Sequence, residues 1–176
     1  MKSDELRALQ APIKQRYREQ PEAARITLKA QGKLGEGITC SVATGRALVE
    51  AGLHPATGGD GLAVCSGDML LEALVACAGV TVSSVATALG IEVRDGTVRA
   101  EGELDFRGTL GVDKEAPVGF QSIALSFELD TDASKEQLAT LMRLTERYCV
   151  VFQTLRNPPE MRLSVSTSEA GESPRV

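Results

Sequence analysis

The sequence has no tryptophan, and its 176 residues include only two tyrosines, four phenylalanines and one histidine. With so few aromatic rings, the hydrophobic core must be built mainly from Leu, Val, Ile and Ala. A single histidine supplies too few nitrogen ligands for a typical zinc site, and the four cysteines include no C-x-x-C pair. We therefore expect neither a bound metal nor another cofactor.

Runs of basic residues are also absent, and the net charge is −5. Because binding to nucleic acid depends on neutralising phosphate groups, we expect no nucleic-acid partner. The first residues show no basic segment followed by an apolar one, so we expect no secretory signal and a cytoplasmic location. The longest apolar-rich stretch, residues 69–89, contains a glutamate and four hydroxyl side chains. We interpret it as a core helix and expect no membrane contact.

The N-terminal third of the chain predicts a helix followed by a β-hairpin. Residues 3–20 form a charged helical segment that begins near Ser3, and Pro12 is expected to break or kink it. Residues 25–34 and 38–44 alternate apolar and polar side chains on either side of a Gly-Glu-Gly turn. This alternation around a glycine-rich turn is typical of two antiparallel strands.

A long apolar helix is predicted over residues 66–89, with Ser66 as its N-cap and Gly90 as its C-terminal stop. Its apolar residues are spread nearly all round, which indicates that other elements cover it on several sides. Two alternating strands, residues 93–106 and 120–129, are expected to follow, joined by an exposed loop.

Residues 134–148 predict a second, amphipathic helix capped by Ser134, which continues as helix or a tight helical turn to residue 155. A last strand is expected over residues 161–167. The succession of strands, helix, strands, helix and strand predicts an α+β fold, with two long helices on one face of a mainly antiparallel sheet. We expect three parts: an N-terminal helical segment (1–24), the α+β domain (25–167) and a flexible tail (168–176).

The cysteines do not form a motif by spacing alone. Cys77 lies in the middle of the long helix and Cys149 follows the second helix. Each by itself indicates core packing, because cysteine is among the most buried residue types. Cys40 and Cys65 are interpreted in the same way, with Cys65 the more accessible of the two. For His54, in a loop, the favoured interpretation is a solvated or turn-bonded side chain rather than an acid or base.

Two segments together resemble the OsmC-like family. The stretch Cys65-Ser-Gly-Asp-Met-Leu-Leu-Glu-Ala-Leu-Val-Ala-Cys77 resembles the family's first cysteine segment. There, an acidic residue opens a long apolar helix and a cysteine follows about two and a half turns later. The stretch Thr145-Glu-Arg-Tyr-Cys149-Val-Val-Phe-Gln-Thr-Leu-Arg-Asn-Pro-Pro is similar to the second cysteine segment. The resemblance implies an OsmC-like fold over roughly residues 25–167.

The resemblance also implies a thiol peroxidase that serves oxidative-stress defence. Cys77 would attack the O–O bond of a hydroperoxide and become a sulfenic acid. Cys149 would resolve this acid as a disulfide, and an external dithiol would reduce the pair by exchange. The family further implies an intertwined homodimer with the cysteines near the subunit interface.

An apolar helix position raises the pKa of a thiol, so such a reaction needs a nearby cation. In the family, an arginine from the N-terminal hairpin region supplies it, held by the acidic residue at the start of the long helix. Asp68 occupies the acidic position, which adds it to the expected catalytic residues. The hairpin shows no clear arginine at the family's place, and Arg25, Arg46 and Lys33 stay open as substitutes.

Two other interpretations stay open. The missing arginine favours a non-catalytic, small-molecule-binding module of the same fold, in which the cysteines line an apolar cleft. The charged N-terminal helix is also compatible with a dimeric scaffold whose partner binds that helix.

Overall fold

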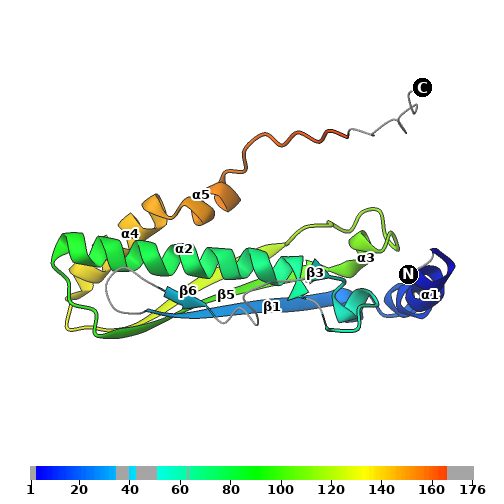
Figure 1. Cartoon of the computed structure of the whole chain (residues 1–176), viewed down its shortest axis with the longest axis horizontal. Helices are drawn as coiled ribbons and strands as arrows, with labels where there is room; N and C mark the ends of the chain where they lie inside the picture. The colour runs from blue at the N-terminus through cyan, green and yellow to red at the C-terminus, as the bar shows by residue number, and fades with distance from the viewer. Residues whose placement is uncertain (1–2, 35–39, 43–50, 63, 166–176) are drawn as a thin grey trace, which may run out of the picture.

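The computed structural model describes residues 3–34, 40–42, 51–62 and 64–165 of the chain, with the backbone alone for residues 3–7, 9, 28–34 and 40–42. A long helix, α2 (Ser66–Leu89), lies along one face of a twisted antiparallel sheet (Figure 1). At one end of the sheet the chain starts with α1 (Ser3–Glu19), and beside α2 lie the two C-terminal helices (Figure 1). This arrangement confirms the α+β fold and places both cysteine segments in one layer.

The sheet contains four strands in the order β2-β1-β5-β6, and each neighbouring pair is antiparallel. β1 (Arg25–Leu34) and β2 (Cys40–Val42) confirm the predicted hairpin, whose Gly-Glu-Gly turn falls outside the described residues. β5 (Asp95–Asp105) and β6 (Ser122–Asp130) complete the sheet. In β6 every second side chain turns inward, as period-two alternation requires: Ile123, Leu125, Phe127 and Leu129.

The helix α2 packs on β1 and β5 with one broad face and meets the C-terminal helices on a second side. Its buried residues recur at helical spacing: Leu71, Leu74, Val75, Ala78, Gly79, Val82, Val85 and Ala86. The remaining face, with Leu70 and Val80, is exposed in this chain. By length and composition alone α2 is long enough to cross a membrane, but its packing on the sheet is that of a core helix.

The sequence predicted the capping residues at both ends of α2, and the prediction for the N-terminal end is wrong. Gly90 adopts the left-handed conformation (φ 66°) and ends the helix, as predicted. The N-cap is Cys65 rather than Ser66, and its side chain makes no capping hydrogen bond. The backbone of Ser66 is already helical, so its hydroxyl is not in the N-cap position.

Four short elements between β2 and β6 were not predicted from the sequence. The segment predicted as a glycine-rich loop contains a single turn of 3-10 helix, η2 (Pro55–Thr57). It is flanked by β3 (Ala51–Gly52) and β4 (Val64–Cys65), which pair in parallel. A one-turn helix, α3 (Phe106–Thr109), follows β5 directly.

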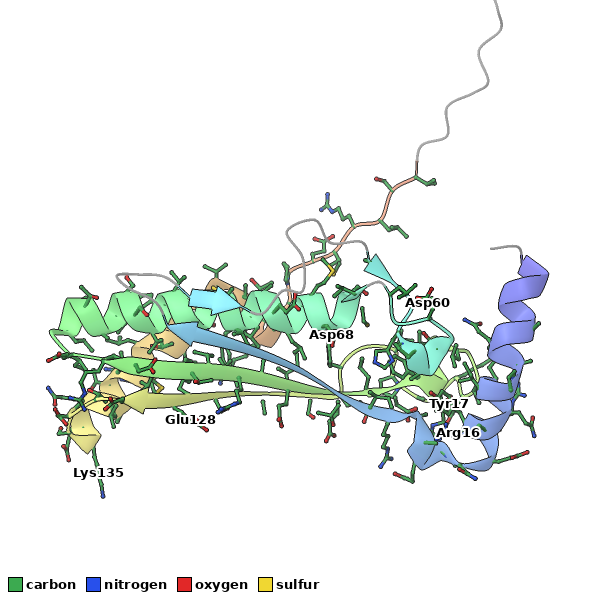
Figure 2. The ribbon with its side chains drawn as sticks, turned by 60° about the horizontal axis from the view of Figure 1, so that its bottom comes forward. Arg16, Tyr17, Asp60, Asp68, Glu128 and Lys135 are labelled. Carbon is green, nitrogen blue, oxygen red and sulfur yellow. The ribbon has the colours of Figure 1, made fainter. Side chains whose placement is uncertain are left out.

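The helix α1 runs through Pro12, so the expected break is wrong. Proline leaves the carbonyl four residues earlier unpaired, but Ala8 and Pro12 are both exposed and water can satisfy that group. A 3-10 turn, η1 (Pro21–Ala24), then leads into β1. Tyr17 is buried where α1 meets η2 (Figure 2), so the end of the helix is fixed to the domain.

The helix α4 (Lys135–Tyr148) begins, as predicted, at Ser134, which forms a capping box with Gln137. The chain breaks at Cys149 and continues as α5 (Val150–Arg156). Beyond it, the strand predicted over 161–167 is wrong for residues 161–165, which have no regular structure. Leu163 is fully exposed there, because no described strand of this chain lies beside the segment to pair with it.

Candidate functional site

The structure brings together Cys77 and Cys149, which are far apart in the sequence. Cys149 is 1% exposed and belongs to the main core cluster, and the less buried Cys77 packs against that cluster. Cys77 also helps raise the pKa of Cys149, so the two side chains lie close to each other in space. Both are free thiols. The fold therefore brings the two predicted cysteines close together, while the roles of the two residues stay a prediction.

Cys149 reaches the core because it lies at a bend between two helices. Its N–H donates to the Thr145 carbonyl at 2.9 Å, and its own carbonyl accepts from the Gln153 N–H at 2.9 Å. Cys149 thus ends α4 and begins α5 without losing its backbone hydrogen bonds. Glu146 joins the two helices across the bend, since its carbonyl accepts from Gln153 and its carboxylate pairs with Arg156. Backbone hydrogen bonds of Cys149 and side-chain contacts of Glu146 therefore both stabilise the bend.

The surroundings of Cys149 disfavour its thiolate. Burial is the largest cause, and it raises the pKa of Cys149 to about 11, against an ordinary value of 9.0. The backbone N–H groups of Phe152 and Val151 oppose this rise, and the hydrogen bond and charge of Cys77 add to it. At pH 7 roughly one molecule in ten thousand carries a Cys149 thiolate. Cys149 is therefore a poor first nucleophile.

A cavity of about 240 Å³ adjoins Cys149 between β6, α4 and α5. Its polar lining comes from Thr145 and Glu146, and the rest is apolar: Leu125, Phe127, Met142 and Phe152. A second cavity of about 320 Å³ shares Leu125 and Phe152 with the first and extends toward Leu74 and Arg156. Together they give Cys149 an apolar approach along β6. The sequence interpretation did not single out Thr145, although its spacing of four from Cys149 on a helix was a signal.

Asp68 lies in the first turn of α2, toward the end of the molecule that holds Tyr17 (Figure 2). Burial raises the pKa of Asp68, and the charge of His54 opposes that rise. The pKa of Glu72, one turn further on, is raised by burial and by the charge of Asp68. Asp68 is about 13 Å along the helix axis from Cys77, so it can act on that thiol only through another group.

His54 is the nearby basic group that acts on Asp68. Its Nδ1 accepts from the Ala56 N–H at 3.0 Å, which confirms the turn-bonded interpretation. The ring also stacks on Phe106, with 5.1 Å between centroids. His54 and Cys65 line a third cavity, of about 380 Å³, whose other walls are mainly apolar. The sequence did not predict this grouping, because His54, Cys65 and Phe106 are separated along the chain.

The expected activating cation stays a prediction. Arg25 pairs with Glu22 at 3.1 Å, and its charge helps lower the pKa of Asp105 at the end of β5. Lys33 is described only through its backbone in β1, and Arg46 lies outside the described residues.

A buried ion pair that the sequence interpretation missed stabilises the end of β5. Asp105 is 1% exposed on its side chain and accepts from Arg107, with 2.6 Å between Oδ2 and Nη2. Arg107 also pairs with Asp113 at 3.3 Å. The hydrogen bond from Arg107 is the main cause that lowers the pKa of Asp105. These ion pairs fix the loop that follows β5.

Within the described residues, no three His, Cys, Asp or Glu side chains lie close enough together to bind a metal ion.

Comparisons with known proteins agree with this architecture. A protein-family model described as OsmC-like protein matches residues 58–164. An OsmC-like hydroperoxide resistance protein from Jannaschia sp. CCS1 has a similar structure, with a TM-score of 0.58 and 17% identity over 83% of this chain and 96% of that chain. An OsmC-like protein from Mycoplasma pneumoniae gives a TM-score of 0.53 and 16% identity over 76% of this chain and 86% of that chain. No curated protein matches the chain.

Proposed function

Because this chain belongs to the OsmC-like protein family, whose model matches residues 58–164, we propose that it is a cysteine-based peroxidase that reduces hydroperoxides. The observation that carries the proposal is that Cys77 packs against the core cluster that contains Cys149 and acts on the Cys149 thiol. A structural relative from Jannaschia is described as a hydroperoxide resistance protein, which supports the same class of substrate.

In the proposed reaction, the Cys77 thiolate attacks one peroxide oxygen. An S–O bond forms, the O–O bond breaks and the alcohol leaves after taking up a proton, so that Cys77 becomes a sulfenic acid. The Cys149 sulfur then bonds to the Cys77 sulfur and the sulfenic oxygen leaves as water. An external dithiol reduces the disulfide by two successive exchanges and is itself oxidised.

The environments of the two thiols support this division of roles. Cys149 is almost fully buried and its raised pKa keeps it protonated, which suits a resolving thiol that waits for its partner to be oxidised. Cys77 is the less buried of the two. Asp68 is proposed as a supporting residue that holds a basic side chain in the site, and the charge of His54 already acts on it.

We also propose that the protein is a homodimer. Several large apolar side chains are exposed in the single chain and are available to a partner: Leu62, Val118, Val150, Met161, Leu163 and Val165. The alternating Met161, Leu163 and Val165 suit a strand that pairs outside its own chain. Light scattering after gel filtration tests this, and a monomer at micromolar concentration contradicts it.

The peroxidase proposal is tested by stopped-flow consumption of cumene hydroperoxide with dithiothreitol as reductant. Cys77→Ser is expected to abolish turnover. Cys149→Ser, mixed with the peroxide in the absence of dithiothreitol, is expected to consume one equivalent and retain a trappable sulfenic acid at Cys77. Cys65→Ser is the matched control, because Cys65 is partly exposed and lies outside the pair. Wild-type consumption no faster than that of Cys77→Ser rejects the proposal.

The cavity beside His54 and Cys65 favours a second candidate, a binding module without catalysis. Its volume of about 380 Å³ and mainly apolar lining suit a small organic ligand. Tight binding of such a ligand by a protein whose thiols stay reduced in excess peroxide would support this candidate over the first.

A further inference from the structure

A hydroxyl group beside the cysteine pair has no hydrogen-bond partner. Thr145 is 2% exposed, and its Oγ1 is the one buried side-chain polar atom left unpaired in the part of the chain that the structure describes. A buried polar atom without a partner destabilises a fold, so its retention needs an explanation. The position of Thr145 supplies one.

A helical hydroxyl can usually bond to the carbonyl one turn earlier, and this chain does so elsewhere. In α2 the hydroxyls of Thr81, Ser83 and Thr87 donate to the carbonyls four residues before them, at 2.7, 2.9 and 2.9 Å. Thr145 lies in α4, where the same bond would be available, yet it does not form. Thr145 instead lines the cavity of about 240 Å³ that also contains Cys149.

Thr145 and Cys149 are neighbours in two ways. The Cys149 N–H donates to the Thr145 carbonyl at 2.9 Å, so the two residues are one helical turn apart. Side chains at this spacing lie on the same face of a helix, about 5–6 Å apart at their Cβ atoms. Thr145 and Cys149 therefore line the same cavity from one face of the helix, and the Thr145 hydroxyl makes no hydrogen bond there.

The resolving step of the proposed reaction needs a hydrogen-bond acceptor for the S–H of Cys149. In the reduced protein Cys77 packs against the core cluster that contains Cys149 and raises the pKa of its thiol. Once Cys77 is a sulfenic acid, Cys149 must direct a lone pair at it, and the thiol hydrogen has to point elsewhere. The raised pKa of Cys149 means that this hydrogen is still present when the attack begins.

We propose that Thr145 is a positioning residue for the resolving step, in which its hydroxyl accepts the S–H hydrogen of Cys149 and turns a sulfur lone pair toward oxidised Cys77. This inference rests on the proposed peroxidase function. As the S–S bond forms and the S–O bond breaks, Cys149 releases its proton through the Thr145 hydroxyl into the cavity. The displaced hydroxide takes up a proton, so the net products are the disulfide and one water.

The test compares Thr145→Val, which keeps the shape without the hydroxyl, with Thr145→Ser, which keeps the hydroxyl. Thr87→Val is the matched control, since Thr87 is an exposed helical hydroxyl that bonds only its own helix. Each reduced protein is mixed with one equivalent of cumene hydroperoxide. Peroxide loss, dimedone adducts on Cys77 and disulfide formation are then followed by quenched-flow mass spectrometry.

We expect the rate of peroxide loss in Thr145→Val to stay within about twofold of wild type. Disulfide formation is expected to slow about tenfold, as the loss of one hydrogen bond in the transition state implies, and the dimedone adduct to accumulate. Thr145→Ser is expected to restore disulfide formation to within about threefold of wild type, whereas a role in packing alone would leave it impaired.

Equal rates of disulfide formation in wild type and Thr145→Val, with normal peroxide loss, overturn this inference and leave the peroxidase proposal intact. A Thr145→Ser protein as slow as Thr145→Val overturns it as well. An absence of peroxide loss in every protein overturns the peroxidase proposal and this inference together. Unfolding of Thr145→Val also contradicts it, because removing a hydroxyl without a partner must not destabilise the fold.

Discussion

The Tyr17 hydroxyl donates a hydrogen bond to the Ala56 carbonyl at 2.6 Å and thereby fixes the N-terminal helix to the turn that holds His54. Gln10 adds a second contact from α1, through its amide, to the Thr57 carbonyl at 3.3 Å. Both contacts start from residues that precede the segment matched by the family model. The N-terminal helix therefore supports the turn whose His54 and Thr57 line the cavity of about 380 Å³.

We expect Tyr17→Phe to lower the free energy of unfolding by about 1 kcal/mol, because the Ala56 carbonyl loses its partner in a buried setting. Tyr148→Phe is the matched control, since Tyr148 is exposed, and we expect it to change stability by less than about 0.5 kcal/mol. Urea unfolding followed by circular dichroism measures both. Equal effects of the two substitutions would contradict the role of the Tyr17 hydroxyl.

Thr145→Val is expected to leave the free energy of unfolding unchanged or to raise it by about 1 kcal/mol. The reason is that the substitution removes a buried hydroxyl without a partner and keeps the volume of the side chain. Thermal unfolding by calorimetry checks this. A loss of more than about 1 kcal/mol would show that the hydroxyl is structurally satisfied.

Alkylation of Cys149 by iodoacetamide is expected to be slow at neutral pH and to rise about tenfold per pH unit until the pKa of about 11 is reached. The folded protein holds this proton more tightly than the unfolded chain does. The associated stability, roughly 2 kcal/mol, is therefore present below about pH 9 and declines as the pH rises through 11. Mass spectrometry of labelled peptides measures the rate, and labelling in the native protein as fast as in urea would contradict the burial of this thiol.

Asp105→Asn is expected to destabilise the protein by about 3 kcal/mol, because it leaves the Arg107 guanidinium without its buried carboxylate. Arg107 lowers the pKa of Asp105, so the stability from this pair is present at neutral pH and is lost as the pH falls through the folded-state pKa. Asp113→Asn is the control, since Asp113 is more exposed and lies 3.3 Å from Arg107, and we expect a loss below about 1 kcal/mol. Urea unfolding at pH 7 distinguishes the two.

Gly102→Ala is expected to destabilise the protein by about 1–3 kcal/mol through overpacking. An added Cβ would come within 2.4 Å of the Phe120 ring and 3.4 Å of Leu71. Phe120 lines two of the cavities, so its displacement is also expected to reduce the binding of small apolar probes. Gly119→Ala is the control, because an added Cβ there has no neighbour within 4 Å. Comparable losses in both variants would contradict this account.

Much of the fold was predictable because its signals are local. The alternation in Ile123, Leu125, Phe127 and Leu129 and the stop at Gly90 each depend on a few neighbouring residues. Local patterns gave a wrong prediction where the structure of a segment depends on a distant pairing strand, as for residues 161–165 of the strand predicted over 161–167. An alternating segment becomes a strand only when another strand pairs with it, and the sequence of one segment does not contain that information.

By itself, the sequence determined the order and type of the main elements and the family resemblance of the two cysteine segments. These depend on period, capping and composition, which short stretches of chain carry. Only the tertiary structure decided that Cys77 and Cys149 lie close together, that burial keeps Cys149 protonated, and that Thr145 lines the same cavity as Cys149 with an unpaired hydroxyl. Those facts depend on how α2 and the bend between α4 and α5 pack, because burial and proximity arise only when elements distant in the chain come together.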